Sequence, residues 1–243
     1  MRNNTLLIDG DMVVFQITSS HEVEVRWDND IHTLHSRFSD CWESFETYLK
    51  DIKETLDANH CVFAFSGSDN FRKQILPTYK ANRKKSRKPL AYKRLVEEIS
   101  LHFETGTKPT LEADDLLGIW ATTGYYNNTI IVSDDKDLLS IPGRTYRLGE
   151  LHEITVEQAD KYHLTQTLTG DVADGYKGCP GIGQKKAEAI LQPCEWDRVV
   201  QAFEGAGLTE QDALTQARVA RILRASDWDN TKEKINLWHP NCP

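Results

Sequence analysis

The sequence predicts an α/β fold built on a mostly parallel central sheet. Three short apolar runs, at residues 5–9, 61–66 and 129–133, have the length and composition of buried strands, and RTYRL at 144–148 is a fourth candidate. Segments with helical spacing lie between these runs, and strands that alternate with helices form parallel sheets. From residue 155 onward the pattern is helical.

The predicted helices are recognised from their apolar spacing. An amphipathic helix is expected at 39–58, where four large apolar residues recur at steps of four, three and four. Further helices are expected at 90–102 and 111–124. The sequence therefore predicts an α/β core at residues 1–154 and a helical part at residues 155–243.

The composition is that of a globular protein outside the membrane. A chain of 243 residues with 39% hydrophobic content can bury one large core, and no apolar run approaches the roughly 20 residues of a membrane span. The N-terminus lacks the apolar region of a secretory signal, and the five cysteines form no CxxC pair. We expect a cytoplasmic protein and a monomer.

The charge is distributed unevenly along the chain. The net charge is −8, yet Phe71 to Arg94 contains ten Lys or Arg and no Asp or Glu. Residues 70–94, called the basic segment below, could be a solvated surface tract. Its interleaved aromatic residues, which could stack on bases, favour a nucleic-acid contact instead.

Acidic residues gather where the predicted strands end. Asp9 ends the first strand, Asp135 and Asp137 follow the third, and LEADD at 111–115 opens the helix that leads into the third. Carboxylates also occur at helix starts for dipole reasons, but the carboxyl ends of parallel strands meet at one edge of a sheet. An all-carboxylate group there is typical of a Mg²⁺ or Mn²⁺ site. The candidate ligands are Asp9, Glu112, Asp114, Asp115, Asp135, Asp137, Asp171 and Asp174.

The helical part contains a glycine-rich turn. Thr155 and Gln158 form a capping box at its start. Residues 170–191 carry five glycines and then a helix from about Gln184, an arrangement that exposes backbone N–H groups to an anion. A last helix is expected at 209–226, with a basic stripe that is either a solvated face or a DNA contact: Arg218, Arg221 and Arg224.

In this order, the motifs resemble those of the flap endonuclease and 5′-nuclease family, which includes the N-terminal nuclease domain of bacterial DNA polymerase I and free-standing phage enzymes. The matching pieces span residues 6–191 and are LLIDGD, FRKQILPTYKANRK, LEADDLLG, VSDDKDLL and GDVADGYKGCPGIGQKKA. The C-terminal ARVARILRASDW and INLWHP are similar to the 5′→3′ exonucleases of short-tailed phages.

The resemblance implies a fold and an activity. It implies a PIN-like core, a helical arch in the basic segment and a helix-three-turn-helix at 170–191. It also implies 5′→3′ exonuclease action on duplex DNA and on the RNA of RNA–DNA hybrids, with cutting of 5′ flaps, by two-metal hydrolysis. Two Mg²⁺ ions, which Mn²⁺ could replace, and a K⁺ ion at the helix-three-turn-helix are the implied cofactors.

The resemblance also assigns roles to individual residues. The first metal would be held by Asp9, Glu112, Asp114 and Asp115, the second by Asp171 and Asp174, with Asp135 and Asp137 at or between the two. The scissile phosphate and the 5′ strand would be gripped by Tyr79, Lys80 and Arg83. The implied DNA contacts are Arg72, Lys73, Lys84, Lys85, Gly178, Gly181, Gly183, Gln184, Lys185 and Lys186.

Two positions depart from the family pattern. An aspartate is expected shortly after the second strand, where this chain has Gly67. Either Asp69 replaces it, or the first metal has one ligand fewer. Asp134 stands where the family usually has a small residue, and it is either an outer acid or merely exposed.

Three other functions would use part of this pattern. A phosphatase of the haloacid dehalogenase kind would use the Asp9-Gly10-Asp11 motif but would not need the basic segment. A single-strand ribonuclease of the PIN type would lack residues 170–191. A non-catalytic or weakly active DNA-binding protein would use the basic segment, but eight converging carboxylates would repel its ligand.

Overall fold

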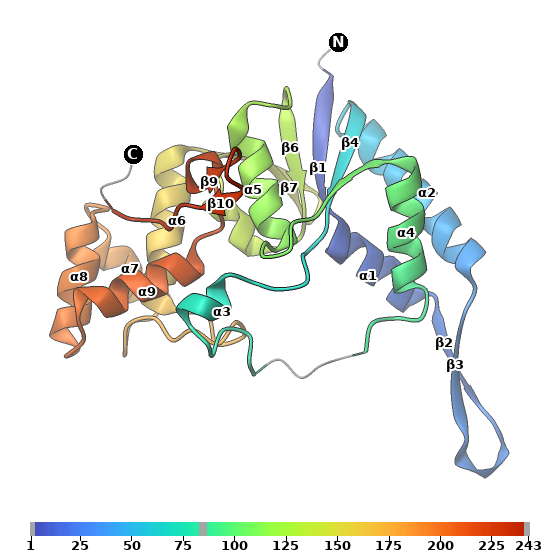
Figure 1. Cartoon of the computed structure of the whole chain (residues 1–243), viewed down its shortest axis with the longest axis horizontal. Coiled ribbons are helices and arrows are strands. Elements are labelled where there is room, and N and C mark those ends of the chain that lie inside the picture. Colours follow the sequence, from blue (N-terminus) through green and yellow to red (C-terminus); the bar gives the residue numbers. More distant parts are fainter. Residues whose placement is uncertain (1–2, 83–86, 241–243) are drawn as a thin grey trace.

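The computed structural model describes residues 3–82 and 87–240, and it confirms the mostly parallel sheet (Figure 1). Six strands lie in the order β5-β4-β1-β6-β7-β8, and only β8 runs antiparallel to its neighbour among the strands of this sheet that the structure describes. The strands are β1 (Asn4–Asp9), β4 (Ala58–Ala64), β5 (Glu104–Gly106), β6 (Thr129–Val132), β7 (Gly143–Arg147) and β8 (Glu150–Ile154).

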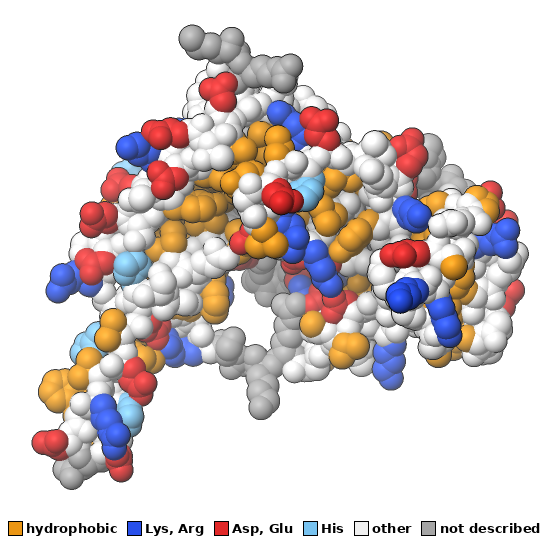
Figure 2. Space-filling view, turned by 180° about the vertical axis from the view of Figure 1, so that it is seen from behind, with side chains coloured by type: hydrophobic (Ala, Val, Ile, Leu, Met, Phe, Trp, Pro, Cys, Tyr) orange, Lys and Arg blue, Asp and Glu red, His pale blue; other side chains and the backbone are white. Residues whose placement is uncertain are grey.

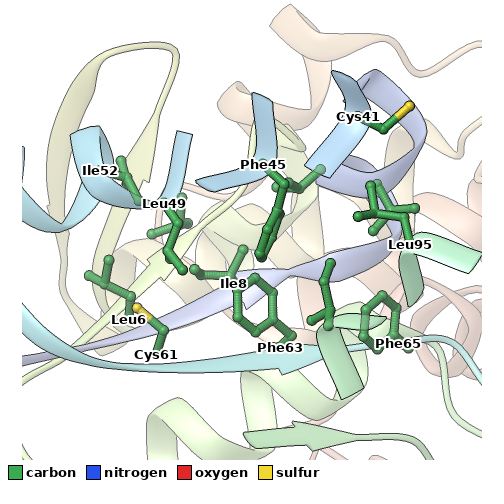
Figure 3. Close-up of a cluster of buried hydrophobic side chains, with 14 of the residues drawn as sticks. Leu6, Ile8, Cys41, Phe45, Leu49, Ile52, Cys61, Phe63, Phe65 and Leu95 are labelled. Carbon is green, nitrogen blue, oxygen red and sulfur yellow. The ribbon is translucent and has the colours of Figure 1, made fainter. Parts of the chain in front are cut away.

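Both faces of the sheet are covered, because successive side chains of a strand point to opposite faces. Leu6 and Ile8 pack into a core with α1 (Gly10–Ser20), α2 (Phe38–Thr55) and α4 (Tyr92–His102), as Figure 3 shows. Leu7 points to the other face and packs against residues of α5 (Ala113–Thr123).

A helical part follows the sheet and has its own small core. It contains α6 (Val156–Thr169), α7 (Gln184–Ile190), α8 (Trp196–Gly205) and α9 (Glu210–Ala220). The predicted capping box is confirmed, since Thr155 and Gln158 bond reciprocally at the start of α6. No helix in residues 3–82 and 87–240 is long and apolar enough to cross a membrane.

The second part is not purely helical, and this prediction was wrong. α9 ends at Ala220 instead of 226, and the chain then extends into the two-residue strands β9 (Trp228–Asp229) and β10 (Lys234–Ile235). Ile222 and Leu223, which follow α9, pack into the core between the sheet and α5. The boundary expected at residue 154 therefore does not separate two independent cores.

Two elements near the N-terminus were not predicted. α1 begins at Gly10, immediately after β1 ends at Asp9, so no loop in the sequence marks the start of the helix. A hairpin of β2 (Glu22–Arg26) and β3 (His32–Ser36) then projects from the body as an arm (Figures 1 and 2). Its alternating EVEVR pattern was the available signal.

The basic segment is not the helical arch that the resemblance implies, as far as the structure describes it. It contains α3 (Arg72–Ile75) and the first residues of α4, with turns or irregular backbone elsewhere in 70–82 and 87–91. Pro77 and Pro89 interrupt helical hydrogen bonding, and unpaired like charges destabilise a helix. Residues 83–86, which include Arg83, Lys84 and Lys85, lie outside the described residues.

Candidate metal centre and nucleic-acid interface

A pocket of about 470 Å³ opens at the carboxyl ends of β1 and β6. It brings together acids that the sequence predicted to converge, from both strand ends, from the start of α5 and from the glycine-rich turn. Seven predicted acids line it: Asp9, Glu112, Asp114, Asp135, Asp137, Asp171 and Asp174. The predicted gathering at one edge of the sheet is confirmed for these residues.

Asp9 is fixed by the junction of β1 and α1. It is the N-cap of α1, where its Oδ1 accepts a hydrogen bond from the Met12 N–H at 3.0 Å, and its Oδ2 accepts one from Ser133 Oγ at 3.0 Å. Burial, together with the negative charges of Asp11 and Asp135, raises the pKa of Asp9 to about 6. The carboxylate is thus held in place, and no Lys, Arg or His of residues 3–82 and 87–240 forms an ion pair with it.

Asp114 lies in the first turn of α5, whose N-cap is Glu112. Burial raises the pKa of Asp114 well above its usual range, and the negative charges of Asp9 and Asp135 raise it further. The helix start accounts for acids in this turn, but it does not account for their accumulation against Asp9 and Asp135.

Asp135 and Asp137 follow β6 on a short 3₁₀ helix, Lys136–Ser140. Asp137 Oδ1 accepts hydrogen bonds from Gln166 Nε2 at 2.8 Å and from the Tyr162 hydroxyl at 3.4 Å, both on α6. Burial and the neighbouring Asp135 raise the pKa of Asp137 to about 6. The two α6 residues were missed, because nothing in the sequence indicates that α6 packs against this turn.

The basic segment reaches the pocket through Tyr79 and Lys80. The Tyr79 hydroxyl donates to Glu112 Oε2 at 2.9 Å and to Asp174 Oδ2 at 3.3 Å, and Lys80 Nζ forms an ion pair with Glu112. The Lys80 backbone has a left-handed φ of 54° and donates its N–H to the Asp174 carbonyl at 2.7 Å. Such strain persists only where the surroundings enforce it.

Asp115 does not face the pocket, so its assignment as a metal ligand is wrong. It is fully buried, and its two oxygens accept hydrogen bonds from Arg72 at 2.8 and 2.7 Å. Arg72 is also buried, and it donates to the Val219 and Arg221 carbonyls at 2.9 and 2.5 Å. Arg72 therefore tethers the end of α9 and cannot be the DNA contact that was predicted.

The two departures from the family pattern have structural explanations. A Cβ on Gly67 would lie 1.8 Å from the Lys108 carbonyl oxygen, so no side chain fits there. Asp69 does not replace the missing acid, because it is exposed, pairs with Lys73 and does not line the pocket. Asp134 accepts a hydrogen bond from the Leu148 N–H at 3.0 Å, which fixes the turn between β7 and β8.

The glycine-rich turn presents part of the predicted DNA-binding set. Five members are exposed at or just before the start of α7: Gly181, Gly183, Gln184, Lys185 and Lys186. Lys186 Nζ donates to the Gly181 carbonyl at 2.9 Å. Gly178 is buried and its N–H donates to Gln216 Oε1 at 2.9 Å, so its backbone is not available to DNA as predicted.

The basic stripe predicted on the last helix does not form one exposed face, since Arg218 is half-buried and donates to the Trp238 carbonyl at 3.2 Å. Arg221 and Arg224 follow the end of α9 and are buried; Arg221 Nε donates to Asp227 at 2.8 Å, and Arg224 pairs with Asp160 at 2.8 Å. They serve neither as a solvated face nor as a DNA contact. Their two ion pairs join the C-terminal segment to itself and to α6.

The chemistry of the pocket fits divalent cations. Its acids supply hard oxygen ligands. Burial, together with neighbouring negative charges, raises the pKa of Asp9, Asp114 and Asp137, and a bound cation would relieve the repulsion between these charges. Within residues 3–82 and 87–240, no three His, Cys, Asp or Glu side chains are grouped closely enough to hold a metal ion as they stand. The acids line a wall and do not form a closed cage.

Comparisons with known proteins identify relatives along nearly the whole chain. Residues 4–167 match the N-terminal resolvase-like domain of 5′-3′ exonucleases. The chain is 32% identical to the exodeoxyribonuclease of Enterobacteria phage T3, over 97% of this chain and 92% of the phage protein. It is 31% identical to the exonuclease of Escherichia phage T7, over 97% of this chain and 93% of that protein.

Solved structures share the fold at low sequence identity. A phage T5 5′-exonuclease with bound zinc ions aligns with a TM-score of 0.67 at 16% identity, over 90% of this chain and 89% of that one. The catalytic core of Rad2 in complex with DNA aligns with a TM-score of 0.55 at 16% identity, over 84% of this chain and 64% of that one. The sequence matches, taken with this fold, show that the chain belongs to the 5′-3′ exonuclease family.

Proposed function

We propose that this protein is a divalent-metal-dependent 5′→3′ exonuclease that hydrolyses phosphodiester bonds at the 5′ ends of duplex DNA and cuts 5′ flaps. The observation that carries the proposal is the pocket, where seven acids face a lysine and a tyrosine of the basic segment. A phosphatase or a simple DNA-binding protein would not need both features side by side.

The pocket residues would have three roles in hydrolysis: binding metal, orienting a metal ligand and contacting the scissile phosphate. Asp9, Asp114 and Asp135 would hold one Mg²⁺ and Asp137, Asp171 and Asp174 a second, and bound metal would lower the pKa of the attacking water and stabilise the leaving oxygen. Gln166 and Tyr162 keep the Asp137 carboxylate oriented. Lys80 provides a positive charge for the scissile phosphate, beside the Tyr79 hydroxyl.

The finer features of the proposal come from the resemblance. They are the use of Mg²⁺ with Mn²⁺ as a substitute, a K⁺ ion at the turn before α7, action on the RNA of RNA–DNA hybrids, a phosphate-gripping role for Arg83, and work as a cytoplasmic monomer. Among the described residues, the exposed cations Lys73 and Lys185 would contact the DNA backbone outside the pocket.

The test uses a duplex labelled at one 5′ end and a labelled 5′-flap substrate, each with Mg²⁺ and with EDTA. Early release of short labelled products only with Mg²⁺ is the expected result, and the flap substrate ranks the two activities. Asp135→Ala should abolish cleavage while DNA binding in Ca²⁺ is kept, and Asp69→Ala, an exposed acid outside the pocket, is the matched control.

The main competing function is DNA binding without catalysis. It predicts tight, salt-dependent binding of the same substrates with no product in Mg²⁺ or Mn²⁺. Equal cleavage by wild type and Asp135→Ala would overturn the metal assignment.

A further inference from the structure

A carboxylate without a role in the proposed hydrolysis lines the same pocket. Asp11 lies in the first turn of α1, two residues after Asp9. Its Oδ1 accepts a hydrogen bond from the Tyr92 hydroxyl at 2.5 Å, and its Oδ2 accepts one from the Ser66 N–H at 2.8 Å. Both oxygens are therefore already engaged by protein donors, one of them from the basic segment.

Asp11 joins three separate parts of the molecule. Ser66 lies just after β4, and its hydroxyl accepts the Ala113 N–H at 3.0 Å, in the first turn of α5 beside Asp114. Tyr92 is the first residue of α4, where the basic segment returns to the body (Figure 1). Hydrogen bonds through Asp11 therefore connect the C-terminal end of the basic segment to the end of β4 and the start of α5.

Two cations, Arg87 and Lys88, lie shortly before Tyr92 in the sequence; the Asp11–Tyr92 hydrogen bond is called the joint below. Lys88 Nζ is 3.8 Å from the centroid of the buried Tyr92 ring, a cation–π contact made by an exposed residue. Arg87 forms an ion pair with Glu22, whose Oε2 also accepts the Leu90 N–H at 3.0 Å. The position of Lys88 is therefore set by a ring that Asp11 holds at its hydroxyl.

We propose that Asp11 and Tyr92 are positioning residues that place Lys88 as a contact for a DNA phosphate near the pocket. The proposal rests on the proposed function for the nature of the ligand, a DNA strand entering the carboxylate pocket. The Tyr92 hydroxyl touches neither DNA nor metal; it acts through the position of Lys88. The two ends of the basic segment then have different anchors, Glu112 for Tyr79 and Asp11 for Tyr92.

The experiment compares Tyr92→Phe, Lys88→Ala and the double variant. The phenylalanine keeps the ring beneath Lys88 and removes only the hydroxyl that Asp11 holds. Equilibrium binding of a 5′-ended duplex is measured in Ca²⁺ across a salt series, together with KM and kcat in Mg²⁺. Tyr126→Phe is the matched control. Tyr126 lies in the loop before β6 and donates its hydroxyl to Glu104, the first residue of β5, at 2.5 Å, so it lies at the amino ends of the strands, away from the pocket.

The expected result is a shared effect on phosphate binding. Tyr92→Phe should weaken binding roughly five- to tenfold and lower the salt slope by about one, although it removes no charge. Lys88→Ala should do the same, the double variant should add little, and kcat should stay within about twofold. A structural role of the hydroxyl alone would leave the salt slope unchanged.

Three outcomes would overturn the proposal. The first is an unchanged salt slope in Tyr92→Phe with Lys88→Ala reduced, and the second is full additivity in the double variant. The third is a loss of Mn²⁺ affinity by calorimetry in Tyr92→Phe, which would make Asp11 part of the metal site. A wild-type protein that binds DNA but never cleaves it would defeat the proposed function, while the salt slopes would still test this joint.

Discussion

The acids of LEADD divide into two groups that share a helix start but have opposite surroundings. Burial alone would raise the pKa of Glu112, but the positive charges of Arg72 and Lys80 lower it to about 2. Asp115 forms an ion pair with Arg72. Asp114, between them in sequence, faces Asp9 and Asp135, and its pKa is raised well above its usual range. Paired acids hold the fold together, and acids that face other acids are the ones that need a cation from solution.

The largest expected effect is on catalysis, at Asp114, the acid of this group that faces other acids. Asp114→Asn should reduce cleavage by about a thousandfold or more, because a metal ligand is lost. It should leave the free energy of unfolding in EDTA unchanged or higher, because one member of a repelling group is neutralised. Cleavage assays and urea denaturation in EDTA measure the two effects. Clear destabilisation of the metal-free protein would show that Asp114 belongs with the structural acids.

The reverse pattern is expected at the paired acid. Asp115→Asn leaves a buried arginine without its partner charge, and breaking such a pair typically costs about 3–5 kcal/mol of stability. The urea midpoint should fall accordingly. The double replacement Arg72→Met with Asp115→Leu removes both charges and should recover only the part of the loss that comes from the lone charge, because the Val219 and Arg221 carbonyls lose their donor. A variant with normal stability and no activity would return Asp115 to the metal site.

The sequence could predict where acids gather but not which of them face the pocket. Strand ends in a parallel sheet share an edge, so Asp9, Asp135 and Asp137 could be placed from apolar runs alone. The difference between Asp114 and Asp115 depends on Arg72, 43 residues before Asp115, and no local pattern records that pairing.

The same limit explains the other errors. The arginines after α9 have helical spacing in the sequence, yet Arg221 and Arg224 are buried by partners at Asp227 and Asp160. Gly67 could be recognised as a departure from the family, but its cause is the close approach of the Lys108 carbonyl. At both places a tertiary contact decides what the local pattern does not record.

The third prediction concerns His163, a buried base whose charged form is disfavoured by burial, as that of Asp114 is. His163 is buried, and burial together with the charge of Arg221 lowers its pKa to about 3. The unfolded chain binds this proton near pH 6.5 and the folded chain does not, so stability falls as the pH drops from about 6.5 toward 3. At pH 4.5 this contributes a loss of about 3 kcal/mol.

The variant His163→Gln isolates this contribution. Glutamine can still donate to the Ala217 carbonyl, which His163 Nε2 contacts at 2.8 Å, but it does not titrate. The loss of stability between pH 7 and 4.5 should be smaller by about 3 kcal/mol in the variant than in the wild type. Parallel curves for the two proteins would mean that His163 binds its proton equally well in the folded and the unfolded chain, and the burial argument for this residue would fail.

The smallest effect is expected at Lys80. This lysine forms an ion pair with Glu112, one of the paired acids, and it also lines the pocket with the acids that face one another. If it is a phosphate contact, Lys80→Ala should weaken binding of a 5′-ended duplex by about tenfold and lower the salt slope by about one. If it serves only Glu112, the salt slope should match that of the wild type while stability falls. Lys73→Ala, which removes an exposed cation of the same segment, is the matched control for the charge itself. A change in slope for Lys80 that exceeds the change for Lys73 would place the scissile phosphate beside Glu112, where the paired and unpaired acids meet.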